Sequence, residues 1–249
     1  MRTMLLRWSC LLAVCLLVCS GIIHGESPAH HTDTIQTSAG DLRITPIHHA
    51  SLMIEFGGKV FHVDPSSRGD YTGLPKADVI LITDVHGDHM DFGMVKKLSK
   101  PSTVVVAPAA VAETLTQAQV IGNGEKKFIE GVEVEAVPMY NLVRGPQPGV
   151  LYHDQGRGNG YVLTLGGKRL YLSGDTECIP EMKALQNIHV AFVCMNLPYT
   201  MTPQEAAECL KAFRPKIIYP YHYGQSDLKV FSRALQNEAG IEIRIRKWY

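Results

Sequence analysis

Side chains that can bind a metal ion are concentrated in one short segment, in which Asp84, His86, Asp88 and His89 occupy four of six consecutive positions. Asp84 and His86 are two residues apart and face the same side of an extended chain, whereas the adjacent Asp88 and His89 point to different sides. Imidazole and carboxylate are ligands of zinc, manganese or iron. The alternative is a polar loop before a helix capped by Asp91, but the density of ligands favours a metal site.

One loop cannot surround an ion, so further ligands are expected at the ends of other strands. One strand ends in Ser173-Gly174-Asp175, and another ends in Tyr221-His222. The carboxyl ends of strands form the edge where active sites of such sheets collect. Considered alone, Asp175 would be a typical turn residue, and His222 would be a histidine among aromatic residues at the edge of a strand. Their shared placement favours a role for both at the metal site.

The elements that must position these side chains follow from the pattern of apolar residues. The apolar run 79–83 predicts a buried strand that leads directly into the metal-binding segment. A capping box at Thr202 predicts a helix that continues until Pro215. Other strands are expected over 42–47, 52–56, 60–63, 104–107, 132–138, 161–165, 169–172, 191–195, 217–220 and 241–245, and other helices over 91–98, 108–116 and 226–235. The order indicates one α/β domain without repeats or an interdomain linker.

The start of the chain has the pattern of a signal peptide over residues 1–25. Arg2 and Arg7 precede an apolar run of 13 residues, which is too short to span a membrane. An uncleaved anchor is the alternative. We expect an exported protein, periplasmic or secreted, with no stable membrane span once the signal is removed. Residues 26–41 are expected to form a flexible lead-in, and 42–249 the folded domain.

The composition excludes some classes of function. The chain of 249 residues has 24 basic and 24 acidic side chains, so no nucleic-acid partner is expected. Beyond the predicted signal peptide only Cys178, Cys194 and Cys209 remain, an odd number that allows at most one disulfide. Alternatively, all three cysteines are small apolar core residues.

These motifs resemble those of the metallo-β-lactamase superfamily of zinc-dependent hydrolases. Residues 84–89 match its H-x-H-x-D-H motif, except that Asp84 replaces the first histidine. Ser173-Gly174-Asp175-Thr176 resembles the motif of its bridging carboxylate, and His222 the last histidine motif. The segments His49-Ala50-Ser51 and Val63-Asp64-Pro65 resemble its opening strands and Asp-Pro turn. The resemblance extends from about Ile44 to the end of the chain, and is greatest to the branch of L-ascorbate-6-phosphate lactonase and N-acyl-phosphatidylethanolamine-hydrolysing phospholipase D.

The resemblance implies a four-layer αβ/βα sandwich in which two sheets lie face to face with helices outside. It implies one or two divalent ions, zinc first, with manganese or iron also suited because Asp84 is a harder ligand than histidine. Asn141 stands where the family has its middle histidine, and His153 is the next histidine downstream. We favour His153 as the ligand, with Asn141 as the alternative. The expected ligands are Asp84, His86, Asp88, His89, His153, Asp175 and His222.

The function expected from this site is that of a metal-dependent hydrolase, which uses a metal-bound hydroxide on a lactone, ester or phosphodiester. Asp88 or Asp175 would orient the nucleophile and transfer its proton. Arg157, Tyr140 and Tyr223 are weaker candidates for contact with a small-molecule substrate, and Arg157 would suit an anionic one.

Three points remain open at this stage. Because Asp84 and Asn141 depart from the family motif, the alternative function is a metal- or ligand-binding protein with little turnover. His48 and His49 would either support the ligands from behind or serve a core or turn role. The sequence leaves the substrate, the metal and the oligomeric state undetermined.

Flavin-linked oxygen chemistry would need an additional domain for which the chain has no room.

Overall fold

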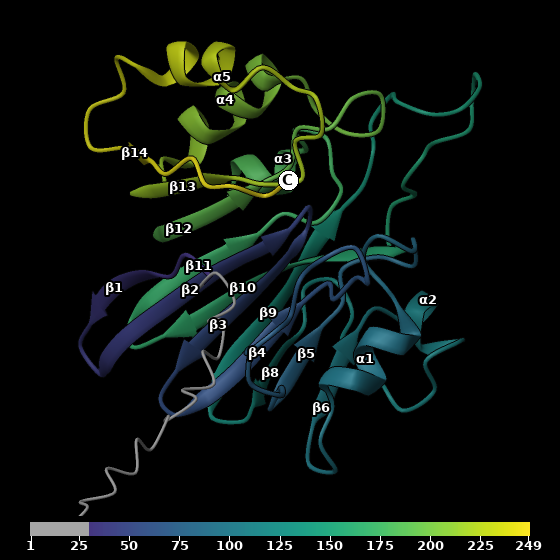
Figure 1. The fold of residues 1–249 in the computed structure, drawn as a ribbon. Helices are drawn as coiled ribbons and strands as arrows, with labels where there is room; N and C mark the ends of the chain where they lie inside the picture. Colours follow the sequence, from purple (N-terminus) through teal and green to yellow (C-terminus); the bar gives the residue numbers. More distant parts are fainter. Residues whose placement is uncertain (1–29) are drawn as a thin grey trace, which may run out of the picture.

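The computed structural model describes residues 30–249, so the expected signal peptide and residues 26–29 lie outside the described part. Two seven-stranded sheets lie face to face, with helices on their outer sides (Figure 1). The four-layer sandwich expected from the motifs is therefore confirmed. Within residues 30–249, no helix has the length and apolar character needed to cross a membrane.

The first sheet contains the first seven strands in sequence order. Its strands are β1 (Asp33–Thr37), β2 (Gly40–His48), β3 (Ser51–Phe56), β4 (Lys59–Val63), β5 (Val79–Leu81), β6 (Val104–Ala107) and β7 (Gln119–Val120). β1 to β4 form antiparallel hairpins, whereas β4 to β7 are parallel to one another. The helix α1 (Phe92–Leu98) lies between β5 and β6 in the sequence, and α2 (Ala109–Ala112) lies between β6 and β7.

The second sheet has the same plan of an antiparallel half followed by a parallel half. Its strands are β8 (Lys126–Ile129), β9 (Val132–Met139), β10 (Gly158–Leu165), β11 (Lys168–Leu172), β12 (Ile188–Val193), β13 (Ile217–Pro220) and β14 (Glu242–Ile243). Its helices are α3 (Pro180–Lys183), α4 (Pro203–Phe213) and α5 (Leu228–Leu235). In Figure 1 these helices lie at the top, away from α1 and α2.

Alternation along the buried strands divides the apolar side chains between two cores. In β5, Val79 and Leu81 belong to the large core between the sheets, whereas Ile80 packs with Met94 and Val95 of α1. Side chains at successive positions of a strand point to opposite faces, which is why β5 is apolar throughout. The strand that leads into the metal-binding segment is therefore held from both sides.

The prediction that residues 26–41 form a flexible lead-in was wrong for the second half of this segment, which contains β1 and the start of β2. β1 pairs antiparallel with β2 along its whole length, and Gly40 closes the turn at a φ of 111°. The carboxylate of Asp33 accepts hydrogen bonds from Arg246 and from the Tyr219 hydroxyl. β1 is an edge strand in which only one apolar side chain, that of Ile35, turns inward, so its sequence has a polar pattern.

Other expectations needed smaller corrections. The helix expected over 108–116 is limited to α2, and Asp227, not Ser226, caps α5. The short elements β7, β8 and α3 were not expected. The capping box at Thr202 is present and opens α4. Cys178 and Cys209 form the one disulfide that the described part contains, whereas Cys194 is buried and free.

Candidate metal centre

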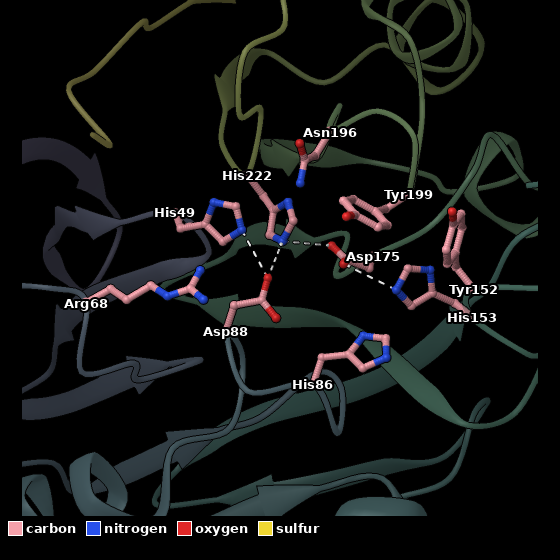
Figure 2. Close-up of a pocket in the computed structure, with 10 residues that line it drawn as sticks. All are labelled: His49, Arg68, His86, Asp88, Tyr152, His153, Asp175, Asn196, Tyr199 and His222. Carbon is pink, nitrogen blue, oxygen red and sulfur yellow. Dashed lines mark hydrogen bonds and ion pairs between the residues drawn. The ribbon is translucent and has the colours of Figure 1, made fainter. Parts of the chain in front are cut away.

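The expected ligands come from separate strand ends and meet at one edge of the sandwich. The segment after β5 supplies residues 84–89, the turn after β11 supplies Asp175, and the end of β13 supplies His222. They surround a cavity of about 490 Å³, a volume suited to a small molecule. Figure 2 shows its lining residues, which are His49, Arg68, His86, Asp88, Tyr152, His153, Asp175, Asn196, Tyr199 and His222.

Asp175 lies at the centre of the expected ligands. Its Oδ2 is 3.3 Å from His89 Nε2 and also 3.3 Å from His153 Nε2. Its Oδ1 is 3.3 Å from His222 Nε2. One carboxylate therefore faces three imidazoles that come from different loops, which is the arrangement expected of a bridging ligand.

The potential ligands form two groups, and Asp175 belongs to the second and also faces His153 of the first. Potential ligand atoms of Asp84, His86 and His153 lie within 4.8 Å of one another, and the same holds for His89, Asp175 and His222. Asp88 joins the second group, because its Oδ2 is 3.5 Å from His222 Nε2. The structure thus brings together all seven expected ligands in an arrangement that two ions could share.

Several buried polar atoms in this centre have no hydrogen-bond partner in the described part of the chain. They are His89 Nε2, Asp175 Oδ1 and both ring nitrogens of His222. A buried polar atom left without a partner costs about 1–3 kcal/mol. A divalent cation would satisfy His89 Nε2, Asp175 Oδ1 and His222 Nε2 together, so the donor set fits a metal ion.

The electrostatics of the centre also favour a cation. Burial alone would raise the pKa of Asp175, but its electrostatic interactions with the His222 and His89 imidazoles hold this pKa well below its usual value. Burial would lower the pKa of His89, yet the charges of Asp175 and Asp64 hold it well above its usual value. The field that stabilises a proton on His89 would equally stabilise a metal ion bound there.

Asp88 is kept ionised although it is partly buried. Burial would raise its pKa, but the His222 imidazole, whose Nε2 is 3.5 Å from Oδ2, and a hydrogen bond from His49 hold that pKa far below the ordinary value. The carboxylate keeps 26% of its side-chain surface exposed and lines the cavity. Asp88 therefore presents an anionic oxygen both to the centre and to a ligand in the cavity.

The histidine ligands are held from behind by further polar residues. His89 Nδ1 is 2.8 Å from Asp64 Oδ2, and the same carboxylate accepts hydrogen bonds from the backbone and hydroxyl of Thr83. Such a contact fixes the imidazole so that its Nε2 faces the ion. The Asp-Pro turn noted in the sequence thus includes a residue that orients a ligand.

His49 and Tyr249 form a second supporting pair. The Tyr249 hydroxyl accepts a hydrogen bond from the Gly224 backbone at 2.9 Å and lies 2.7 Å from His49 Nδ1. His49 Nε2 donates to Asp88 Oδ2 at 3.1 Å, because an ionised carboxylate can only accept. Burial lowers the pKa of His49 and favours its neutral form, in which Nδ1 accepts from the Tyr249 hydroxyl. His49 contacts Asp88 and lines the cavity, and with Asp88 and His222 it forms a third group whose potential ligand atoms lie within 4.8 Å of one another. The contribution of Tyr249 had no signal in the sequence.

Asp84 differs from the other carboxylates because it is paired with an arginine. Arg157 donates from Nε to Asp84 Oδ1 at 3.1 Å and from Nη2 to Oδ2 at 2.9 Å. His86 Nδ1 is 2.8 Å from Asp84 Oδ2 as well. Asp84 is thus shared between the expected metal site and a guanidinium.

The three weaker candidates for substrate contact lie outside the cavity lining. Arg157 is engaged by Asp84, Tyr140 donates to Glu181 Oε2 at 3.0 Å, and Tyr223 packs against Tyr249. Arg68, Tyr152, Asn196 and Tyr199 line the cavity instead. No local pattern in the sequence distinguished Arg68, because it lies in an ordinary polar turn.

Comparison with known proteins agrees with this geometry. The model of the β-lactamase superfamily domain matches residues 43–222. A UPF0173 metal-dependent hydrolase of Geobacillus is 32% identical over 201 residues, which cover 73% of this chain and 85% of the relative. One from Thermus thermophilus is 30% identical over 214 residues, covering 78% of this chain and 91% of the relative.

Solved structures show the same fold. A crystal structure from Parabacteroides distasonis, described provisionally as a metal-dependent hydrolase, is 42% identical and has a TM-score of 0.83. The alignment covers 89% of this chain and all of that one. Igni18, a metallo hydrolase from Ignicoccus hospitalis, has a TM-score of 0.67 at 21% identity, covering 83% of this chain and 95% of that one, and supports the fold alone.

Proposed function

The chain belongs to the β-lactamase superfamily and to the UPF0173 metal-dependent hydrolases, and we propose that it hydrolyses a lactone, ester or phosphodiester bond in a small molecule. The observation that carries this proposal is the position of Asp175, which faces three imidazoles and whose Oδ1 lacks a hydrogen bond. The choice of these bond types is supported by the sequence motifs, which are most similar to those of the branch that contains the lactonase and the phospholipase D.

One or two divalent ions are proposed as the cofactor, with zinc first and manganese or iron as alternatives. Asp84, His86 and His153 would hold one ion, and His89, Asp175 and His222 would hold another. Asp88 would join the second group through its contact with His222, and Asp175 also faces His153 of the first. A bound ion of this kind lowers the pKa of water toward about 7 and polarises a carbonyl or phosphoryl oxygen.

The chain's own residues then divide the remaining tasks. Asp88 lines the cavity, and His49 fixes the direction of its Oδ2, so Asp88 is suited to orient the attacking water and accept its proton. Asp175 is suited to a ligand role, because both of its oxygens face imidazoles. We therefore assign proton handling to Asp88 first.

A second candidate is a metal-binding protein of this fold with little turnover. The observation that favours it is the pairing of Asp84 with Arg157, which already compensates the charge of one expected ligand. Under this alternative the His89 group would still hold an ion, while the Asp84 group would remain incomplete.

One experiment separates the two candidates. Protein purified without chelator is analysed for metal, then tested on neutral lactones, 4-nitrophenyl esters and bis(4-nitrophenyl) phosphate before and after chelation. Hydrolysis that is lost with the metal and restored by zinc, manganese or iron supports the hydrolase, and Asp88→Asn should abolish it. Metal without hydrolysis of any compound supports the second candidate, and protein that binds no metal refutes both.

We also propose that the protein is exported. The basic and apolar pattern of residues 1–25 supports this, and so does the disulfide between Cys178 and Cys209, because disulfides persist in oxidising compartments. N-terminal sequencing of the protein from its native cells tests the proposal, since a mature chain that retains Met1 would refute cleavage.

A further inference from the structure

We propose that Arg68 is the residue that recognises the substrate, and that the substrate carries an anionic group, a carboxylate or phosphate, at some distance from the bond that is cleaved. The inference rests on the proposed hydrolase function and adds the chemical class of the substrate. It assigns to Arg68 the role that the sequence had suggested for Arg157.

The first support is the position of Arg68 in the cavity. It is the only lysine or arginine among the residues that line the cavity. Figure 2 shows its guanidinium beside Asp88 and His49, on the opposite side of the cavity from Tyr152 and Tyr199. A ligand bound over the metal centre would therefore have a cation on one side and two aromatic rings on the other.

The second support is that the turn carrying Arg68 is fixed. The Ser67 backbone donates to Asp91 Oδ2 at 3.1 Å, and the Ser66 backbone donates to the Tyr71 hydroxyl at 3.0 Å. Gly69 lies so close to β2 that a Cβ there would be 2.7 Å from Ile47 Cγ2. The backbone of Arg68 is thus anchored on both sides, which limits the entropy lost when its side chain binds an anion.

The third support is that the Arg68 guanidinium has no carboxylate partner among residues 30–249, although carboxylates are close by. Three other arginines are each paired with a carboxylate. They are Arg157 with Asp84, Arg144 with Glu177 and Glu205, and Arg246 with Asp33. Arg68 therefore retains donors for a ligand. A guanidinium can bind carboxylate or phosphate through two parallel hydrogen bonds.

The charge of the centre explains why an anion would be accepted. Asp64, Asp84, Asp88 and Asp175 contribute four negative charges, and Arg157 and Arg68 contribute two positive charges. A single divalent ion would balance this set, and two would leave it positive by two charges. With one ion, Arg68 is needed to bring the set to neutrality. With two ions, the set carries a surplus of positive charge, which favours a substrate with its own negative group.

The aromatic side of the cavity completes the description of the substrate. The rings of Tyr152 and Tyr199 meet edge to face with centroids 5.0 Å apart, and Tyr199 keeps 45% of its surface exposed. Partly exposed aromatic rings offer an apolar surface at low entropic cost. We therefore expect a substrate with an apolar or planar part toward these rings, the scissile bond over the metals and the anion toward Arg68.

Binding of matched acids tests the proposal without requiring turnover. Zinc-loaded full-length protein is titrated calorimetrically with the dicarboxylates from succinate to suberate, each compared with the monocarboxylate of equal carbon number. One carboxylate can bind at the metals in both compounds, but only the diacid can also reach Arg68. At the best chain length the diacid should bind about tenfold or more tightly than its monoacid.

Three variants make the result specific. Arg68→Gln should bind diacid and monoacid alike, and Arg68→Lys should keep part of the preference because it retains charge without the planar fork. Arg233→Gln makes the same change of charge on α5, outside the cavity lining, and should keep the whole preference. The proposal is overturned if no diacid is preferred by the unmodified protein, or if Arg68→Gln keeps the preference. Failure of the hydrolase function would appear separately, as absent metal or absent hydrolysis.

Discussion

Asn141 Oδ1 lies 2.6 Å from His153 Nδ1 and also accepts the backbone N–H of His153 at 2.9 Å. Because the Asn141 amide nitrogen donates to the Tyr199 carbonyl, the Asn141 oxygen is the atom that faces the imidazole. His153 Nδ1 therefore carries the proton, and Nε2 is left free toward Asp175. The two residues that compete in the sequence for one ligand position are partners in the structure.

This relationship predicts unequal effects of two substitutions. His153→Ala should remove a ligand and abolish tight binding of one ion, whereas Asn141→Ala should lower the affinity for that ion by about 10- to 100-fold, as loss of a ligand's supporting contact does. Competitive titration with a zinc-binding dye measures both. Normal zinc binding by His153→Ala together with loss in Asn141→Ala would reverse the assignment.

His222→Ala should have the largest effect on metal content. His222 Nε2 faces both Asp175 and Asp88, so its loss weakens the second group of ligands and removes a contact of the bridging carboxylate. His86→Ala should affect mainly the first group. Metal analysis per chain checks this, with His31→Ala as an exposed control and circular dichroism to confirm folding. Equal metal in all three variants would contradict the proposed centre.

Tyr249→Phe should reduce function while keeping the packing of the ring. The change removes the hydroxyl that donates to His49 Nδ1, so His49 would no longer be held in the tautomer that donates to Asp88. We expect about a tenfold loss in kcat with little change in KM, in the range found when residues supporting a metal site are removed. The Tyr223→Phe variant serves as control, because Tyr223 lies outside the cavity lining. Unchanged kcat in Tyr249→Phe would show that His49 needs no such partner.

The buried His62 should make folding sensitive to acid. Burial lowers the pKa of His62, and the hydrogen bond from its Nε2 to the Pro75 carbonyl offsets this only in part. Since the unfolded chain takes up this proton at a higher pH than the folded one, stability is fully present above the unfolded pKa of about 6.5 and falls as the pH drops below it.

His62→Gln should therefore flatten the dependence of unfolding free energy on pH between 7 and 5. The difference in slope from the unmodified protein should be at most about 1.4 kcal/mol per pH unit, the value for one proton. Urea denaturation at several pH values measures it, and the comparison cancels the contributions of the other histidines. Identical slopes would show that His62 does not titrate across this range.

The Cys178–Cys209 disulfide should stabilise the fold. It connects the segment after Asp175 to α4, and its cysteines are 31 residues apart in sequence. A bridge over such a loop contributes about 2–4 kcal/mol, mainly by restricting the unfolded chain. Cys178→Ser with Cys209→Ser should lower Tm and make it insensitive to reductant. A reductant-independent Tm in the unmodified protein would argue against the bridge.

The resemblance of the motifs predicted the four-layer sandwich, and the local pattern of residues predicted the first metal-binding segment. The apolar run 79–83 predicts a buried strand, and four ligand types follow it within six residues, so the information is local. The same holds for the capping box of α4, in which Thr202 and Glu205 bond to each other. Patterns of this kind depend on neighbouring residues and can be read before folding is known.

The side chains that support those ligands are set by contacts between distant parts of the chain. His49 and Tyr249 are 200 residues apart, and Arg157 is 73 residues from Asp84, so no local pattern links either pair. Arg68 differs from a surface arginine only because its turn faces the cavity formed where the two sheets meet. Such contacts depend on how the strand ends of both sheets come together, and this is set by the packing of the whole core and not by the residues that make the contact.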